Sequence, residues 1–389
     1  MLNPCAGSAR IEKERMKALN SKKVLIAGAS FAGLSSAHWM SELGYDVTIV
    51  EIGPGLRRGG TAVDIRGKTV DVVKRMGIID EIRANRLNLR QWAFKNANDQ
   101  TERMLVLRAQ GDAPSEHEFE IERFVLLSIL LNAVRDRCEI VFGESIAELR
   151  ETPAGLDVIF EGGARRQFDL VLGCDGLHSG VRKIWFGEEA QFTHFLQHYF
   201  SITIVDKLLI ERDTAQMFNV PGKAVMLNAY KNKTDIIFGF VSEQEILYDY
   251  RDEAWQRRII ADQFAGVGWR IAELLKEVEG STNFYFDKLC QIRMPSWSRG
   301  RVVLVGDAAY CASPAAGMGG SLAIDGASAL SDAMREADDY ALAFADYDKR
   351  LRPFVDEVQA EAVRMGVETL VPRTEGAIRR RNAKTGNEF

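Results

Sequence analysis

Residues 23–51, KVLIAGASFAGLSSAHWMSELGYDVTIVE, constrain the fold more than any other stretch of the chain. The apolar run at 24–27 is typical of a strand that is buried on both faces. Gly28 then permits a sharp turn, and Gly33 lets a following helix pack closely on the sheet. Glu51 ends a second strand about twenty residues after the turn, where a carboxylate can accept hydrogen bonds from a ribose. The stretch predicts a Rossmann-like βαβ unit in an α/β fold, with an anion site at the helix N-terminus.

The fingerprint Gly-x-Gly-x-x-Gly is altered at its middle position, where the chain has Ser30. A serine Cβ slightly crowds the point at which backbone meets phosphate. One alternative is a βαβ unit without nucleotide, and another is a nucleophile elbow with Ser30 as the nucleophile. The elbow requires Gly-x-Ser-x-Gly, whereas the second glycine comes one residue late here. Turn, spacing and Glu51 together favour a dinucleotide.

Composition limits the remaining classes of function. A chain of 389 residues is long enough for two domains, and its net charge of −5 argues against nucleic acid as the main partner. Five cysteines without a CxxC pair indicate reduced thiols in a cytoplasmic protein. Residues 1–21 have no apolar signal segment, and the apolar run at 124–134 is too short to cross a membrane. We therefore expect a soluble protein without a membrane or nucleic-acid partner.

Two further segments lie near the predicted nucleotide site. The glycine-rich loop at 53–67 contains Arg57, Arg58 and Asp64, and it either touches the ligand or is simply solvated. Arg123 begins an apolar helix at the end where the helix dipole disfavours a cation. It either forms a structural salt bridge or contacts a ligand phosphate, and its position against the dipole favours the phosphate.

Two later strands also end in turns that suit ligand binding. After the strand at 169–172, Asp175-Gly176 forms a tight turn and Ser179 is a candidate helix N-cap, although the segment can be read as a well-formed turn alone. After the strand at 301–305, Asp307 lies at a carboxyl strand end, where open α/β sheets bind ligands. The glycine-rich helix start at 317–320 presents several free N–H groups.

Residues 191–285 contain strands and helices but no nucleotide signature, which makes them the candidate substrate domain. Phe218, Met226 and Phe238 could line an apolar pocket there, although most such residues are core. His194 and His198 have no third ligand nearby, so we expect no metal site. Residues 69–85 are expected to be helical, a long helix is expected from 336, and the tail at 378–389 is expected to be solvated.

Taken together, the segments 28–33 with Glu51, 175–182 and 306–322 resemble the class A flavoprotein monooxygenases of the para-hydroxybenzoate hydroxylase fold. Within that group, residues 57–67 and 284–297 resemble the tetracycline-inactivating flavin monooxygenases, or tetracycline destructases. The resemblance implies that Asp307 contacts the ribityl–pyrophosphate region of FAD and that Arg123 touches FAD. It also implies that the Asp175 motif serves FAD and the nicotinamide reductant, and that the loop at 57–64 lies near the flavin ring.

In such relatives NADPH or NADH reduces FAD, and O2 then forms a flavin C4a-hydroperoxide that oxygenates the substrate. The resemblance therefore implies a monooxygenase acting on a tetracycline-like polycyclic aromatic, with no side chain as catalyst. A hydroxylase of another aromatic or polyketide is the alternative, as is a catalytically idle flavin- or antibiotic-binding protein. Halogenation is not expected, because the Trp-x-Trp-x-Ile-Pro signature is missing. Tyr310, Met318 and Ser321 replace the His, Gln and Asn that are usual beside the flavin ring.

These expectations divide a monomeric chain into an N-terminal tail (1–21), an FAD-binding domain (22–85, 118–190 and 286–335), a β-sheet substrate domain (86–117 and 191–285) and a long C-terminal bridging helix with its tail (336–389). The expected cofactor-binding residues are Gly28, Ser30, Gly33, Glu51, Arg57, Arg58, Asp64, Arg123, Asp175, Asp307, Pro314, Gly317, Met318, Gly319 and Gly320.

Overall fold

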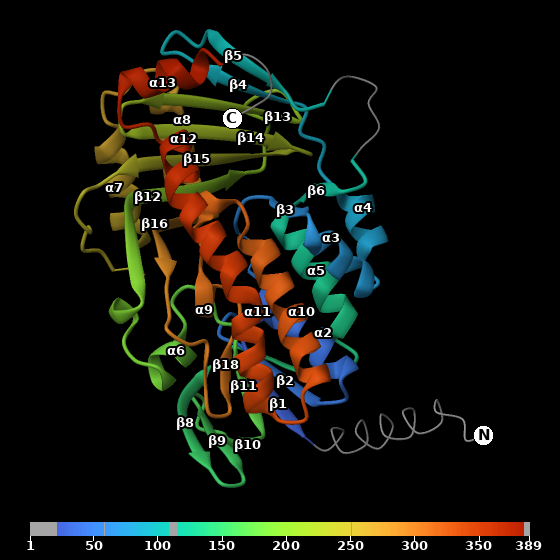
Figure 1. Cartoon of the computed structure of the whole chain (residues 1–389). Coiled ribbons are helices and arrows are strands. Elements are labelled where there is room, and N and C mark those ends of the chain that lie inside the picture. Colours follow the sequence, from blue (N-terminus) through green and yellow to red (C-terminus); the bar gives the residue numbers. More distant parts are fainter. Residues whose placement is uncertain (1–21, 58, 109–114, 250, 385–389) are drawn as a thin grey trace.

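The computed structural model describes residues 22–57, 59–108, 115–249 and 251–384. Among them, one half of the fold is built on a six-stranded sheet with the order β17-β18-β11-β1-β2-β7 (Figure 1). All neighbouring strands are parallel except β17. The carboxyl ends of the parallel strands therefore meet at one edge of the sheet. The strands are β1 (Lys23–Ala27), β2 (Asp46–Glu51), β7 (Glu139–Phe142), β11 (Leu170–Gly173), β17 (Ser298–Arg299) and β18 (Val302–Leu304).

Helices cover this sheet because its strands are apolar on both faces. Val24, Leu25 and Ile26 of β1 are fully buried, as expected for a central parallel strand. The helical segment expected at 69–85 is two helices, because Gly77 has a φ of +73° and ends the first. The helices are α2 (Phe31–Glu42), α3 (Lys68–Arg75), α4 (Ile79–Asn85), α5 (Arg123–Val134), α6 (Gly180–Trp185), α9 (Asp307–Tyr310), α10 (Gly319–Glu336) and α11 (Tyr340–Glu361).

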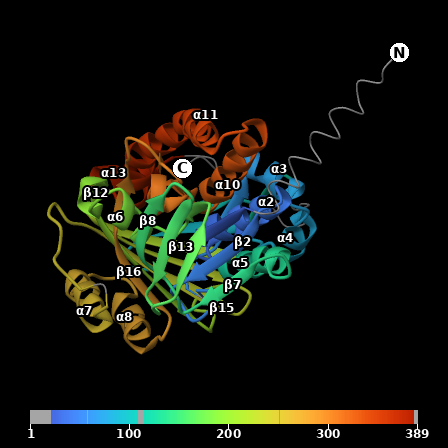
Figure 2. The same ribbon diagram turned by 90° about the horizontal axis from the view of Figure 1, so that it is seen from below.

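A seven-stranded sheet with the order β16-β12-β15-β14-β13-β4-β5 forms the second half. Helices α7 (Glu253–Phe264) and α8 (Ile271–Gly280) cover one of its faces, on the side away from α11 (Figure 2). The other face carries a row of aligned side chains, Tyr285, Ile202, Ile237 and Met226. The strands are β4 (Gln91–Lys95), β5 (Thr101–Val106), β12 (Thr193–Val205), β13 (Thr214–Val220), β14 (Lys223–Tyr230), β15 (Lys233–Val241) and β16 (Phe284–Ile292).

The expected domain boundary between 285 and 286 is wrong, because it falls inside β16. This strand pairs with β12 from Phe284 to Ile292 and belongs entirely to the seven-stranded sheet. Two small sheets complete the fold: β8 (Ile146–Thr152), β9 (Gly155–Phe160) and β10 (Arg165–Phe168) form one, and β3 (Val63–Arg66) and β6 (Glu118–Ile121) form the other.

The C-terminal segment joins the two large sheets. Helix α11 runs alongside α10 toward the seven-stranded sheet (Figure 1), and Gln359 near its end donates to the backbone oxygens of Ile292 and Cys311. The π-helical turn η3 (Ala362–Val367), α12 (Glu368–Leu370) and α13 (Glu375–Asn382) follow. The expectation of a solvated tail is wrong for its first residues, because α13 buries Arg381 to 7% exposure.

None of the helices in the described residues combines the length and apolarity needed to span a bilayer.

Candidate functional site

The turn between β1 and α2 is shaped by two glycines. Gly28 has a φ of +99°, and a Cβ on it would lie 2.5 Å from the backbone oxygen of Cys174. A Cβ on Gly33 would lie 1.8 Å from the backbone oxygen of Gly28. Neither position tolerates a side chain, and the first turn therefore lies directly against the second motif, which begins at Asp175.

Glu51 fixes the same turn from the end of β2. Its Oε2 accepts from the backbone N–H of Ala29 at 2.8 Å, and its Oε1 accepts from that of Gly53 at 2.9 Å. Each carboxylate oxygen keeps a further acceptor position for a ribose hydroxyl. Ser30 is the N-cap of α2 but makes no side-chain cap, so the first N–H groups of the helix remain available to an anion.

Arg123, the first residue of α5, points at this helix start. Its Nη2 donates to Ser30 Oγ and its Nη1 to the backbone oxygen of Gly59, both at 3.3 Å. Burial lowers the pKa of Arg123 to about 10; the nearby charge of Arg57 adds to the effect and Asp307 opposes it. Arg123 is therefore a buried cation at the N-terminus of α2, hydrogen-bonded to neutral oxygens and attracted by the charges of Asp307 and Glu51.

The third motif lies against the same helix. A Cβ on Gly306 would come within 2.9 Å of Ala32 Cβ, which puts Asp307 beside the first turn of α2. Burial raises the pKa of the Asp307 carboxyl, and Arg123 opposes the rise. The three separate motifs thus converge around one helix start.

The start of α10 is equally open. Pro314 begins the short turn η2 (Pro314–Ala316), Gly317 is left-handed with a φ of +63°, and Met318 caps α10 without a side-chain hydrogen bond. A Cβ on Gly320, next to Gly319, would lie 3.6 Å from both Phe31 and Val63. The uncapped N–H groups of α10 therefore lie between α2 and β3, where they can meet a ligand that also contacts α2.

The loop after β2 reaches the second sheet. The Arg57 guanidinium lies 4.6 Å from the ring centre of Tyr285, and the backbone oxygen of Asp64 accepts from Ser321 Oγ at 3.0 Å. Burial is the main reason that the pKa of Asp64 is raised. Arg58 lies outside the described residues.

The second motif is held together by its own side chains. Asp175 accepts from Ser179 Oγ at 2.5 Å and from the Val181 N–H at 2.9 Å, and Ser179 caps α6 as expected. Arg182 is completely buried and donates to the backbone oxygen of Ala308 at 3.0 Å. Arg182 thereby ties the second motif to the third, a role that its place in the sequence does not reveal.

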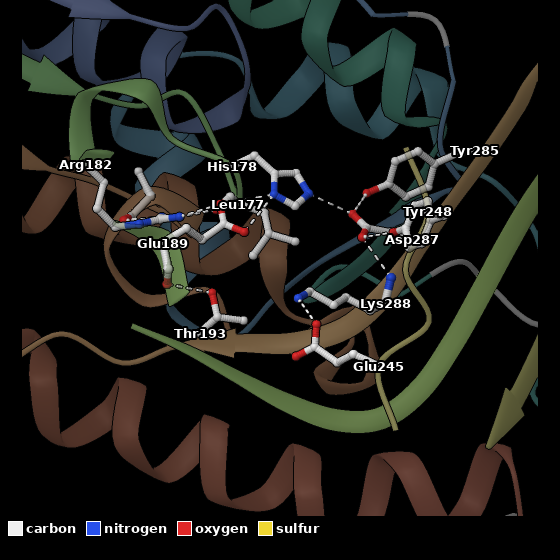
Figure 3. Close-up of polar contacts among 11 residues, drawn as sticks. Leu177, His178, Arg182, Glu189, Thr193, Glu245, Tyr248, Tyr285, Asp287 and Lys288 are labelled. Atoms are coloured by element: carbon white, nitrogen blue, oxygen red, sulfur yellow. Dashed lines mark hydrogen bonds and ion pairs between the residues drawn. The ribbon is translucent and has the colours of Figure 1, made fainter. Parts of the chain in front are cut away.

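His178 and Asp287 form a further polar cluster that the sequence reading missed (Figure 3). His178 Nδ1 lies 3.1 Å from Glu189, and Nε2 lies 3.2 Å from Asp287 Oδ2. Hydrogen bonds to Asp287 and then Glu189 raise the pKa of His178 to about 9. The hydroxyls of Tyr285 and Tyr248 also donate to Asp287, at 2.7 and 3.1 Å. The only local signal was the alternation that places Tyr285 and Asp287 on one face of β16.

Tyr310 does not take the position expected for it. It is 1% exposed, and its hydroxyl accepts from Tyr347 at 3.0 Å between α10 and α11. Its ring lies 4.5 Å from that of Trp297. Its side chain therefore serves helix packing, whereas Met318 and Ser321 do lie at the start of α10.

The seven-stranded sheet separates the expected substrate-lining residues. Phe218 and Phe238 are 3% and 0% exposed in the cluster beneath α7 and α8, so the expectation that they line a pocket is corrected. Met226 lies on the opposite face, because it pairs with Ile237 in the row that ends at Tyr285. Ala315 of η2 packs on this face.

A cavity of about 590 Å3 lies beside Met318, with Arg66, Lys68, Asp325 and Phe354 among its lining residues.

These features fit the expected FAD. A backbone cradle without side chains, two uncapped helix starts, a ribose acceptor and a buried cation suit a dinucleotide with an attached ring system. In the part of the chain that the structure describes, no group of three or more His, Cys, Asp or Glu side chains could hold a metal ion.

Comparisons with known proteins agree with this geometry. The FAD binding domain family matches residues 21–358. A flavin-dependent monooxygenase of Legionella longbeachae is 33% identical over 343 residues, which cover 87% of this chain and 87% of that protein. The crystal structures of the tetracycline destructases Tet(51) and Tet(55) are each 32% identical and give TM-scores of 0.81 and 0.82, and each match covers 93% of this chain and 94% of the other.

Proposed function

From the premise that the chain belongs to the FAD-binding flavin-dependent monooxygenases, we propose that it oxygenates a tetracycline-like polycyclic aromatic with NADPH or NADH as the reductant. The observation that carries the proposal is the convergence of three motifs at α2 below an apolar sheet face. The substrate class is supported by the likeness to the two destructases and by the apolar side chains of this face.

FAD, when bound, supplies the redox chemistry and activates O2. The chain would hold it through the turn at Gly28 and Gly33, with Glu51 at the ribose and Arg123 and the start of α2 at the pyrophosphate. Asp307 would contact the ribityl region. The N–H groups at the start of α10 would donate to the ring, where fixed dipoles stabilise negative charge without reorganising.

The substrate would lie between the ring and the sheet face. Ile202, Ile237 and Met226 give that face an apolar surface, and Ala315 borders it from the cofactor side. An apolar wall excludes water, which protects a reactive oxygen species from wasteful loss.

The reductant would bind transiently. The described residues contain one Rossmann-type sheet, and its dinucleotide turn is the one assigned to FAD. The nicotinamide must therefore reach the ring from outside, without a second fold of this kind to hold it.

The test is NADPH and NADH oxidation by the FAD-loaded protein with and without tetracycline, combined with mass spectrometry. The expected result is faster oxidation with tetracycline and a product one oxygen atom heavier. Oxidation that yields only hydrogen peroxide would reject tetracycline as the substrate and favour another polycyclic aromatic. A protein that shows flavin absorbance but oxidises neither nicotinamide would contradict the proposed reductant.

A further inference from the structure

Tyr285 stands between the two halves of the molecule. Its ring lies under the Arg57 guanidinium at 4.6 Å, and Arg57 belongs to the loop that follows the ribose-binding Glu51. Tyr285 also interacts electrostatically with Arg123, as do Arg57 and Asp307, and all three influence the pKa of Arg123. Tyr285 is also the end of the apolar row formed with Ile202. The Tyr285 ring therefore lies where the loop after β2 meets the sheet face, and its hydroxyl turns to Asp287.

A chain of hydrogen bonds leads from this hydroxyl to the surface. Tyr285 Oη lies 2.7 Å from Asp287 Oδ2, and the same oxygen lies 3.2 Å from His178 Nε2. Asp287 is 3% exposed, so the middle of the chain is closed to solvent. The His178 side chain is 53% exposed, so its outer end is open. Figure 3 shows the three side chains in this order.

We propose that Tyr285, Asp287 and His178 form a proton path that supplies the oxygenation site from solvent. The proposal rests on the monooxygenase activity of the family but does not depend on which substrate or nicotinamide is used. Tyr285 would be the residue that faces the reacting groups, and Asp287 and His178 would act through it.

The stoichiometry of the reaction requires such a supply. A monooxygenase converts RH, O2, NAD(P)H and one proton into ROH, NAD(P)+ and water, so one proton per turnover comes from solvent. When no substrate is present, reduced flavin reacts with O2 and one proton to give oxidised flavin and hydrogen peroxide. A proton from solvent is therefore needed in this reaction as well. A cleft that excludes water must admit this proton through protein groups.

Each transfer in the path is balanced. His178 begins as an imidazolium and passes its Nε2 proton to Asp287 Oδ2, while the Tyr285 hydroxyl turns its own hydrogen toward the proposed substrate position. Tyr285 then gives that hydrogen to the acceptor and receives the proton from Asp287. The His178 ring then turns so that its bare Nε2 takes up a proton from water, and it turns back to Asp287, which restores the starting state.

The surroundings of His178 keep it charged at neutral pH. Asp287 faces it from β16 and Glu189 faces it from the turn η1 (Glu189–Gln191), and these two carboxylates raise its pKa to about 9. Around Asp287 lie the Tyr285 and Tyr248 hydroxyls, and around Glu189 lies Arg182. The charges of Lys288 and Glu245 are paired with each other at 2.7 Å. A group with a raised pKa is protonated below that pKa, so the proton supply should fail as pH rises through about 9.

The first test uses the FAD-loaded protein after chemical reduction with dithionite. It is mixed with O2 across a pH series in H2O and D2O, and flavin reoxidation is followed by absorbance. The variants are His178→Gln, which keeps an N–H donor but cannot carry a proton, and Tyr285→Phe. Tyr248→Phe is the matched control, because it removes a hydroxyl from the other oxygen of Asp287 without breaking the path.

The expected wild-type rate falls above pH 9 and shows a solvent isotope effect. Both path variants should be slower by roughly 10²-fold at neutral pH and should lose the pH dependence and the isotope effect. The control variant Tyr248→Phe should keep the wild-type pH dependence and the solvent isotope effect. Variants that bind FAD normally and reoxidise like the wild type would overturn the proposal. Because neither tetracycline nor a nicotinamide is present, this outcome is separate from any failure of the proposed function.

A second test needs no cofactor. Imidazole NMR titration of the FAD-free protein should show a raised pKa for His178, and Asp287→Asn should lower it by removing the larger of the two causes. A titration of His178 near 6.5 in the wild type would refute the Asp287–His178 coupling on which the path depends. Thermal unfolding of each variant shows whether the fold has been retained.

Discussion

At the scale of single residues, the candidate site depends on glycine positions at which an added Cβ atom would clash with neighbouring backbone. Gly28 and Gly33 leave no room for a Cβ, and the space they free is taken by the backbone of the neighbouring strand end. Ser30 at the middle position keeps its hydroxyl as an acceptor for Arg123, so the departure from the glycine fingerprint contributes a contact to the site.

The turn between β1 and α2 can therefore be tested by adding a single methyl group at Gly33. Gly33→Ala places a Cβ 1.8 Å from the Gly28 oxygen, and we expect loss of bound FAD because the turn must open. Gly55→Ala, in the loop that follows β2, is the control, since no described atom lies within 4 Å of its Cβ. Flavin content after purification and FAD titration by fluorescence measure the result. Retention of full FAD affinity in Gly33→Ala would contradict the cradle.

Arg123 is tested by removing its charge. Arg123→Met keeps most of the side-chain volume but would lose the proposed charged hydrogen bonds to FAD, each worth about 1.5–3 kcal/mol. We expect FAD affinity to fall by roughly 10- to 100-fold, as measured by calorimetry. Arg83→Met, on α4 and paired with the exposed Asp80, should leave affinity unchanged. An equal effect of both variants would mean that net charge alone matters.

Residue identities predicted the local geometry but not the distant contacts. Gly28, Gly33 and Glu51 were predictable because a tight turn and a ribose acceptor each require a particular residue type at a fixed spacing. Arg182, His178 and Asp287 were not, because their partners lie on other strands and spacing within one segment carries no information about them.

At the scale of elements, helix α10 combines the proposed cofactor contact at its start with a packing role in the core. Its first turn faces the site, and its middle packs on α11 through Tyr310, which comes from the third motif. The strands of both sheets were largely predictable from their apolar runs. The end of the seven-stranded sheet at β16 was not, because the strand continues without a break in its pattern past residue 286.

The contact between α10 and Tyr310 predicts a rescue. A Cβ on Gly326 would lie 1.8 Å from the Tyr310 hydroxyl, so Gly326→Ala should destabilise the protein by about 1–3 kcal/mol through overpacking. Adding Tyr310→Phe removes the clashing oxygen and should recover part of the loss. Urea unfolding of the single and double variants gives the coupling free energy. Additive effects would mean that the clash is relieved elsewhere.

At the scale of the whole molecule, the C-terminal segment fastens the two sheets. Arg381 of α13 donates to Asn219 of β13 at 2.8 Å and to the backbone oxygen of Thr369, and its guanidinium lies 4.5 Å from the Phe94 ring. Burial lowers its pKa to about 10. The run of three arginines looked like a solvated end, because composition alone does not show which of them turns inward.

Neighbouring arginines provide the matched test of this anchor. Arg381→Met leaves Asn219 and Thr369 oxygens without a donor and should cost about 1–3 kcal/mol of unfolding free energy. Arg380→Met changes the same charge on an exposed side chain and should cost little. Thermal unfolding and limited proteolysis report the difference. Equal stability of the two variants would show that α13 does not hold the sheet.

The path of the chain between its two large sheets has a consequence for how such a protein can diversify. It passes to the seven-stranded sheet after α4 and again after η1, and it comes back at β6 and after β16. A single pair of crossover points in a gene would therefore not exchange the seven-stranded sheet as one intact unit. New specificities in this lineage should therefore arise by point substitution on the face that carries Ile202 and Ile237, and recombination would be a poor source of them.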